Sequence, residues 1–139
     1  MHIPVMLKET IDRLAVKPDG VYLDCTLGDG GHSAEILRRG GRNCRLLGMD
    51  RDSDALMRAM GRLKNFPAVV AYAHSNHAHV GEKCDELGFE RLDGAVIDTG
   101  VSSEQLDEAC RGFSFMREGP LDMRMDRSAA LTAYDVVNT

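Results

Sequence analysis

The stretch DCTLGDGGHS occupies residues 24–33 and follows the short apolar run Val21–Leu23. Three of its residues are glycines, Gly28, Gly30 and Gly31, and a segment with helical spacing follows them. Glycine adopts backbone conformations that other residues avoid, and it lets a ligand approach the main chain closely. The stretch therefore predicts a strand, a tight ligand-binding turn and a helix, which together open an α/β fold with a parallel sheet.

The same alternation of apolar runs and helical spacing continues to Asp98. Helices that connect successive strands imply parallel strands, right-handed crossovers and helices on both faces of the sheet. After Asp98 the periodicity stops, and residues 99–128 are predicted to form a long ordered loop before a helix over Leu131–Val137. The expected strands are Val21–Leu23, Arg45–Met49, Ala68–Tyr72 and Leu92–Ile97; the expected helices lie around Leu7–Leu14, over Ser33–Arg39, after the cap Asp52, and from Ser75 or Asn76 to Leu87, with Gly88 as the stop.

Three aspartates, Asp24, Asp50 and Asp98, each end or nearly end a predicted strand, where open parallel sheets bind their ligands. Asp50 follows the glycine loop by about 20 residues, the spacing at which an acid accepts hydrogen bonds from ribose hydroxyls. These features fit a dinucleotide and S-adenosylmethionine about equally, and a turn without a ligand is a third alternative. Asp24 favours S-adenosylmethionine, because a carboxylate would repel a pyrophosphate and attract the ammonium group of a methionine moiety.

Composition limits the classes of protein to consider. The chain has 139 residues, 43% hydrophobic and 28% charged, which is typical of one soluble domain. Its net charge of −5 counts against a general nucleic-acid binder. No apolar run approaches the ~18 residues that span a membrane, and the N-terminus does not resemble a signal peptide, so a cytoplasmic protein is expected. The cysteines are scattered at Cys25, Cys44, Cys84 and Cys110, which predicts reduced thiols rather than disulfides or zinc.

Two local clusters have competing interpretations. The stretch RRGGRNCR, residues 38–45, holds four arginines in eight residues and is either a solvated loop or an RNA-phosphate patch. The histidines His74, His77 and His79 lie near Cys84, but on a helix they would point in different directions. No metal site is therefore predicted.

The region after Asp98 closely resembles the signature of the RsmH (MraW) family, bacterial methyltransferases that act on the exocyclic N4 of a cytosine in small-subunit ribosomal RNA. The resemblance rests on GVSS at residues 100–103, QLD at 105–107 and RGFSFMREGPLDMRMD at 111–126. It continues upstream in HIPVML at residues 2–7, in the glycine loop and in DRD at 50–52, so it covers essentially the whole chain.

The resemblance implies a Rossmann-like class I methyltransferase fold, with strand order 3-2-1-4, over residues 1–139. It also implies S-adenosyl-L-methionine as the cofactor and small-subunit ribosomal RNA as the partner. Asp98 would act both in catalysis and in cofactor binding. The other residues that would contact the cofactor are Asp24, Gly28, Gly30, Gly31, His32, Asp50, His77 and Gln105.

The chain departs from the family pattern at several positions. His77 stands where the family has an aromatic residue beside the adenine, and Asp29 stands where the family often has arginine. Leu27 and Thr99 also differ. Members of the family are roughly twice as long, with a seven-stranded sheet and an inserted helical domain, so this chain is truncated relative to that fold.

These observations leave two main hypotheses and one weaker one. The chain is a ribosomal RNA cytosine-N4 methyltransferase, or it is a truncated, non-catalytic cofactor-binding module; a nicotinamide-dependent oxidoreductase is disfavoured. The fourth strand would form an open sheet edge, which predicts a homo-oligomer through that edge or through exchange of the C-terminal segment. Phe113 and Phe115 either stack on the target base or anchor the loop in the core.

Overall fold

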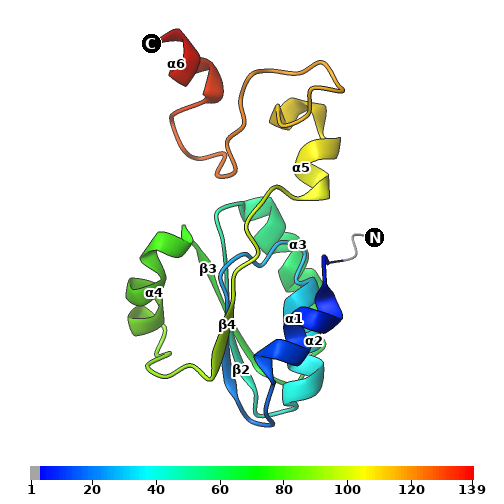
Figure 1. Cartoon of the computed structure of the whole chain (residues 1–139). Helices are drawn as coiled ribbons and strands as arrows, with labels where there is room; N and C mark the ends of the chain where they lie inside the picture. The colour runs from blue at the N-terminus through cyan, green and yellow to red at the C-terminus, as the bar shows by residue number, and fades with distance from the viewer. Residues whose placement is uncertain (1–3) are drawn as a thin grey trace. The chain divides into compact units, whose positions relative to one another are not determined.

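A computed structural model describes residues 4–139, so His2 and Ile3 of the N-terminal motif lie outside the described residues. The chain forms two compact units, one ending at Asp98 and the other running from Thr99 to Thr139 (Figure 1). Within the described part of the chain, no helix has the length and apolar character that a membrane crossing requires.

The first unit is built on a parallel sheet of four strands in the order β3-β2-β1-β4, as predicted. In this register Asp24 lies opposite Gly48 on one side and Val96 on the other, and Asp50 lies opposite His74. The strands are β1 (Val21–Asp24), β2 (Arg45–Asp50), β3 (Val69–His74) and β4 (Gly94–Val96).

The helices of this unit begin and end at local signals that are legible in the sequence. Asp52 caps α3, since its side chain accepts a hydrogen bond from the backbone N–H of Asp54 at 3.0 Å. Asn76, and not Ser75, is the cap after β3. The elements are α1 (Leu7–Leu14), α2 (Gly31–Gly40), α3 (Ser53–Leu63), the 3₁₀ turn η1 (His77–His79) and α4 (Val80–Glu86).

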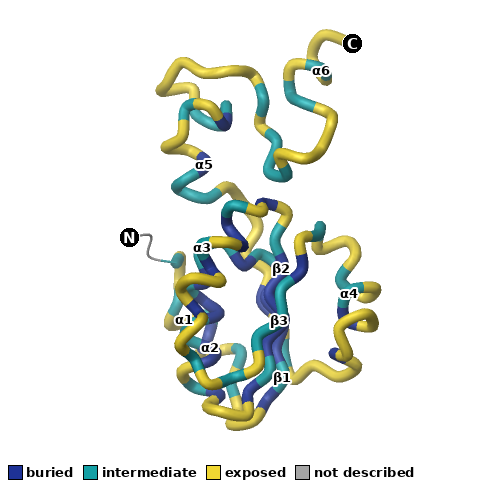
Figure 2. Tube along the Cα trace, turned by 180° about the vertical axis from the view of Figure 1, so that it is seen from behind, coloured by how far each residue is buried: buried dark blue, intermediate teal, exposed yellow. Residues whose placement is uncertain are grey.

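Helices cover both faces of the sheet, because successive strand residues point to opposite sides. Tyr22 and Leu46 are fully buried against α1, α2 and α3, whereas Leu23, Leu47 and Met49 pack on the side of α4. Figure 1 shows α4 alone on one side of the strands, and Figure 2 shows the buried residues concentrated along the sheet.

The second unit corrects the prediction of an uninterrupted loop over residues 99–128. It contains α5 (Ser103–Asp107) and the 3₁₀ turn η2 (Ala109–Arg111), followed by α6 (Ala133–Asn138) near the predicted C-terminal helix. The missed helix α5 begins with a capping box, in which Ser102 and Gln105 each bond the other's backbone N–H. That S-x-x-Q pattern is readable in the sequence.

Candidate cofactor site

The glycine loop joins β1 to α2 in a conformation that needs glycine at two positions. Gly28 and Gly30 have φ values of 52° and 75°, in the left-handed region that side-chain-bearing residues avoid. The backbone N–H of Leu27 donates to the carbonyl of Met49 at 2.8 Å, and that of Gly30 donates to the carbonyl of Leu27 at 2.8 Å. The loop is therefore a tight turn held against the end of β2.

Asp50, at the end of β2, is oriented by two backbone donors. Its Oδ2 accepts from the N–H of Gly28 at 2.7 Å, and its Oδ1 accepts from the N–H of Asp52 at 2.9 Å. The residue is only partly buried, and each carboxylate oxygen has a second lone pair that can accept another hydrogen bond. This carboxylate can accept hydrogen bonds from the two hydroxyls of a ribose, and its predicted contact with the cofactor stays a prediction.

Asp24 is placed differently, because its carboxylate is only 1% exposed. Its Oδ2 accepts from the hydroxyl of Ser33 at 2.7 Å, and its Oδ1 accepts from the N–H of Thr26 at 3.2 Å. Burial raises the pKa of Asp24 above its ordinary value, and the bonds from Ser33 and Thr26 oppose that rise. Both carboxylate oxygens of Asp24 therefore accept hydrogen bonds from the chain itself. They connect Thr26, at the start of the glycine loop, to Ser33 in the first turn of α2.

The N-terminal segment lies on the first turn of α2. A side chain on Gly31 would collide with the ring of Pro4, so glycine is required there for the close approach. His32 is 7% exposed, and its Nε2 lies 3.2 Å from the carbonyl oxygen of Val5, to which it donates in the tautomer that carries a proton there. Gly31 and His32 therefore attach the N-terminal segment to the loop.

Asp98 lies just beyond β4, next to the start of the glycine loop. Its backbone N–H donates to the Thr26 hydroxyl at 2.7 Å, and the N–H of Cys25 donates to the Val96 carbonyl at 2.9 Å. The Asp98 side chain is exposed. The fold thus brings Asp24, Asp50 and Asp98 to one edge of the sheet, as predicted.

His77 belongs to η1 and is exposed. Since η1 follows β3, the neighbour of β2, His77 lies at the same edge of the sheet as Asp50. Within residues 4–139, no group of three or more His, Cys, Asp or Glu side chains is arranged to hold a metal ion.

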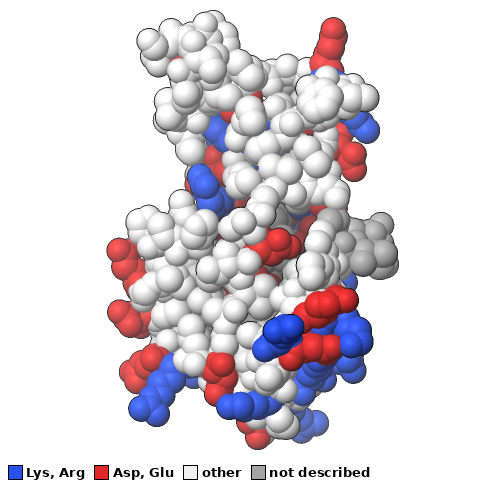
Figure 3. Space-filling model, viewed as in Figure 1, with Lys and Arg blue, Asp and Glu red and all other residues white. Residues whose placement is uncertain are grey.

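Two of the four arginines in the stretch at residues 38–45 are paired with acids. Arg38 and Arg39 both bind Glu35, at 2.6 and 2.7 Å, and Arg39 also binds Asp12 at 2.7 Å. The guanidinium of Arg45 lies 4.6 Å from the centre of a phenylalanine ring. Figure 3 shows positive and negative side chains interspersed over α1 and α2. This pairing favours the solvated-loop interpretation over an RNA-phosphate patch.

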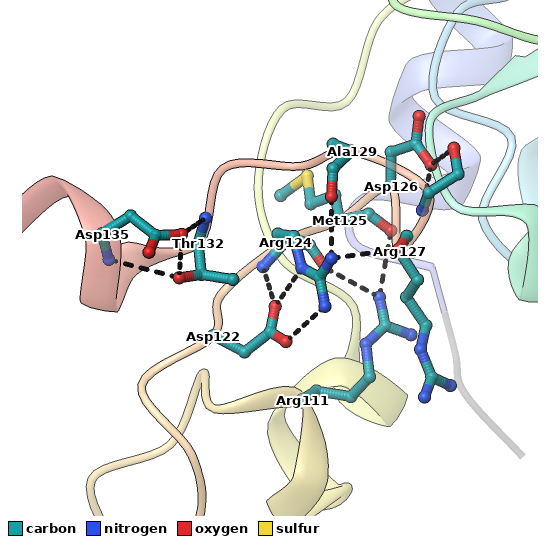
Figure 4. A network of polar contacts seen from close by, with 10 residues as sticks. Arg111, Asp122, Arg124, Met125, Asp126, Arg127, Ala129, Thr132 and Asp135 are labelled. Atoms are coloured by element: carbon teal, nitrogen blue, oxygen red, sulfur yellow. Dashed lines mark hydrogen bonds and ion pairs between the residues drawn. The ribbon is translucent and has the colours of Figure 1, made fainter.

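The second unit is ordered by arginines that bind its own backbone (Figure 4). Arg111 is 4% exposed, and its Nη2 donates to the carbonyls of Arg124 and Met125 at 3.3 and 3.1 Å. Arg124 holds both carboxylate oxygens of Asp122 at 2.8 Å, and hydrogen bonds from Arg124 lower the pKa of Asp122 to about 2. These contacts support an ion pair within the unit for Arg124 and backbone hydrogen bonds for Arg111, over phosphate binding by either residue.

Both ends of the segment 112–119 lie very close to the backbone of other residues. A side chain on Gly112 would collide with the carbonyl of Pro120, and one on Gly119 would collide with the carbonyl of Ala109. Within this segment, Phe115 is 97% exposed. The interpretation of Phe115 as a core anchor is therefore wrong, whereas Phe113 is half-buried.

Gln105 is 5% exposed and belongs to the capping box of α5. Its side-chain oxygen accepts from the N–H of Ser102 at 3.0 Å, and its own N–H donates to the Ser102 hydroxyl at 3.1 Å. Gln105 thus organises the second unit, and its predicted contact with the cofactor stays a prediction.

The family model of the MraW methylases matches residues 1–139. The chain belongs to the MraW methylase family. Three relatives named ribosomal RNA small subunit methyltransferase H are 51% identical in Clostridium botulinum (strain Kyoto / Type A2), 52% in Symbiobacterium thermophilum and 47% in Clostridioides difficile. Each match covers 99% of this chain and 43–44% of the relative, so this MraW-family chain spans less than half the length of those proteins.

One solved structure agrees with the fold of this MraW-family chain. The crystal structure of a putative rRNA-methylase from Clostridium thermocellum superposes with a TM-score of 0.52 at 23% identity, over 59% of this chain and 48% of that one. Family membership confirms the predicted family and fold, and it implies S-adenosylmethionine as the cofactor. The residues present fit that cofactor, because Gly28 of the glycine loop is partly exposed and Asp50 offers an oriented carboxylate.

Sequence reasoning assigned no role to two groups of residues that the structure brings to the loop. The Ser33 hydroxyl donates to the Asp24 carboxylate, and the Thr26 hydroxyl accepts from the backbone N–H of Asp98. Both residues lie within the stretch at residues 24–33, and that position was a signal that could have identified them. Arg58 contacts Asp29 from α3, and no local pattern points to that contact.

Proposed function

We propose that this chain is the cofactor-binding part of an enzyme that methylates the exocyclic N4 of a cytosine in small-subunit ribosomal RNA, with S-adenosylmethionine as methyl donor. The observation that carries the proposal is the Asp50 carboxylate, which accepts a hydrogen bond from the N–H of Gly28 and so joins the glycine loop to the group that we propose binds ribose. Ribosomal RNA as substrate would place the reaction in the cytoplasm. The relatives' printed names, at 47–52% identity, support the RNA substrate.

The residues of the first unit would divide the cofactor between them. The glycine loop, in which Gly28 is partly exposed, would face the methionine end, and Asp50 would accept hydrogen bonds from the ribose. His77 would stack on the adenine with less area than a larger aromatic ring. The bound cofactor supplies an activated methyl group on a cationic sulfur, which leaves as a neutral thioether when the carbon–nitrogen bond forms.

Asp98 is the residue we propose for catalysis. The exocyclic nitrogen of cytosine is a poor nucleophile, because its lone pair is delocalised into the ring. An exposed carboxylate at the end of β4 can accept a hydrogen bond from the amine, hold the nitrogen in line with the methyl group, and take the proton that the nitrogen loses once it is methylated. Alignment of this kind can supply up to ~7–11 kcal/mol of the barrier.

The target base must leave its stack to reach such a carboxylate. Phe115 is exposed, and it lies in the segment whose two ends, Gly112 and Gly119, pack against neighbouring backbone. An exposed aromatic ring can stack on an unpaired nucleobase. This favours the stacking role for Phe115 over the role of a packing residue.

The alternative is a cofactor-binding module that transfers no methyl group. Transfer of labelled methyl from S-adenosylmethionine to small-subunit ribosomal RNA separates the two, with calorimetric binding of the cofactor measured on the same preparation. Binding with transfer supports the enzyme, and binding without transfer supports the module. Tight binding of NAD in place of S-adenosylmethionine would refute both.

We also propose that the chain self-associates. Among residues 4–139, β4 pairs only with β1, and beside it Ile97 is 58% exposed, so the sheet ends in an open apolar edge. Exchange of the C-terminal segment is the second route. Light scattering should give a mass above 15.3 kDa. A monomer across the concentration range would refute both routes.

A further inference from the structure

Asp29 stands inside the glycine loop, between Gly28 and Gly30, and its carboxylate points to α3. Its Oδ1 accepts a hydrogen bond from Nε of Arg58 at 2.7 Å. The two side chains are 19% and 35% exposed, so the ion pair is partly screened from water. One helical turn further along α3, Nη1 of Arg62 lies 3.5 Å from the carbonyl oxygen of Asp29. Both contacts come from the same face of α3.

The same helix also supports the loop through apolar contacts. The position that a side chain would take on Gly30 lies 3.4 Å from Ala59 and from Leu63, both buried residues of α3. The glycine loop therefore rests on α3 through an apolar contact at Gly30 and a charged contact at Asp29.

The start of α3 is tied to the other half of the site. Asp52, its cap, donates its backbone N–H to the Asp50 carboxylate at 2.9 Å, and Asp50 accepts from Gly28 of the glycine loop at 2.7 Å. The glycine loop and α3 are therefore connected at two places. Asp50 bonds both Gly28 of the loop and Asp52 at the start of α3, and Arg58 of α3 bonds Asp29 of the loop. A substitution at Arg58 would therefore alter the conformation of the loop, where the methionine end of the cofactor is proposed to bind.

We propose that Arg58 is a positioning residue for the cofactor loop, which it holds in its binding conformation through Asp29. The inference rests on the proposed use of S-adenosylmethionine and adds to it a residue that the glycine-loop motif does not contain. Arg58 acts through the conformation of the loop. It therefore affects the affinity of any ligand that binds to the loop, irrespective of the ligand's charge.

The test compares Arg58→Met with the parent chain in two measurements. In the absence of ligand, amide hydrogen exchange at Gly28 and Gly30 should accelerate in the variant, because the loop opens more often. In calorimetry, S-adenosylmethionine and its demethylated product should both bind about twofold to fivefold more weakly, by the same factor, as expected for loss of one partly screened ion pair.

A charge effect acting directly on the ligand predicts a different pattern. Without Arg58 the Asp29 carboxylate would be less compensated, which would strengthen binding of the cationic sulfonium cofactor relative to the product with neutral sulfur. Tighter binding of the cofactor alone, or unchanged exchange at the loop, would overturn the positioning role.

Three further variants complete the design. The exchanged pair Asp29→Arg/Arg58→Glu restores an attraction with its signs reversed and should recover most of the lost affinity and loop protection. Arg38→Met removes an ion-paired arginine from the last turn of α2 and should leave both measurements unchanged. If Arg58→Met does not fold, Asp29→Asn removes the same ion pair from the loop side and carries the same expectation.

Failure of this inference is distinguishable from failure of the proposed function. If the parent chain binds neither ligand, the proposed cofactor use is refuted, and loop exchange still decides whether Arg58 orders the loop. If the parent binds both ligands and Arg58→Met binds them equally well, only the positioning role is refuted.

Discussion

Replacing Asp50 by alanine should weaken the glycine loop and cofactor binding together. The carboxylate accepts two backbone hydrogen bonds, from Gly28 at 2.7 Å and from Asp52 at 2.9 Å. Hydrogen bonds to a charged group are worth about 1.5–3 kcal/mol each, but water can replace them at this partly exposed position. We therefore expect Asp50→Ala to lower the free energy of unfolding by about 1–2 kcal/mol in total.

The loss of the ribose acceptor should add a separate cost in binding. Two ribose hydroxyls without their acceptor cost about 1–3 kcal/mol, which corresponds to a dissociation constant roughly 5-fold to 150-fold higher. Asp50→Asn keeps one acceptor oxygen but turns an amide N–H₂ toward the other backbone donor. It should therefore fall between the parent and Asp50→Ala in stability, yet close to Asp50→Ala in cofactor affinity.

Urea unfolding and calorimetry with S-adenosylmethionine measure the two effects on the same protein. Asp85→Ala is the matched control, since it removes one exposed carboxylate from α4 and changes the net charge equally. A variant Asp50→Ala that loses stability but binds the cofactor as tightly as the parent would show that Asp50 holds the loop and does not bind ribose.

Ser33→Ala removes the hydroxyl that bonds the buried Asp24 carboxylate and should cost about 1–2 kcal/mol near neutral pH. Because burial raises the pKa of Asp24, the free energy of unfolding should fall as pH rises from the ordinary value of 3.8 through the folded pKa. In the variant this fall should extend to higher pH, because the lost hydrogen bond no longer opposes the rise in pKa; denaturant titrations at several pH values without that trend would contradict it. Gly119→Ala should loosen the second unit, seen as faster proteolysis, because its new side chain meets a backbone carbonyl, whereas Gly81→Ala has open space and should be neutral. Asp98→Asn, in a full-length context, should lower the single-turnover rate of methyl transfer more than cofactor affinity; a loss confined to affinity would make it a cofactor ligand only.

The local signals in the sequence predicted the elements of the first unit well. The helix expected around Leu7–Leu14 is present over those residues, and Asp52 caps α3 as its place before an apolar helical pattern indicated. β4 is shorter than predicted, Gly94–Val96 in place of Leu92–Ile97, because an edge strand pairs on one side only and Ile97 remains 58% exposed. Hydrophobic pattern specifies a strand's presence, whereas its length depends on its neighbour.

The second unit was harder to predict for a physical reason. Its order comes from side chains that bind backbone carbonyls, such as Arg111 to Arg124 and Met125, and this bonding leaves no periodic pattern. The capping box at Ser102 and Gln105 is local, and so it was the one signal for α5 that the sequence offered.

By itself, the sequence determined the alternation of strands and helices, the need for glycine in the loop, and the presence of an acid at the end of each of three strands. All of these follow from interactions between residues close together in the chain. Tertiary structure alone decided how the acids differ: Asp24 is buried against Ser33, Asp50 is partly exposed and accepts from Gly28, and Asp29 is held by Arg58. A carboxylate's role depends on which donors reach its oxygens, and those donors come from segments that only folding brings together.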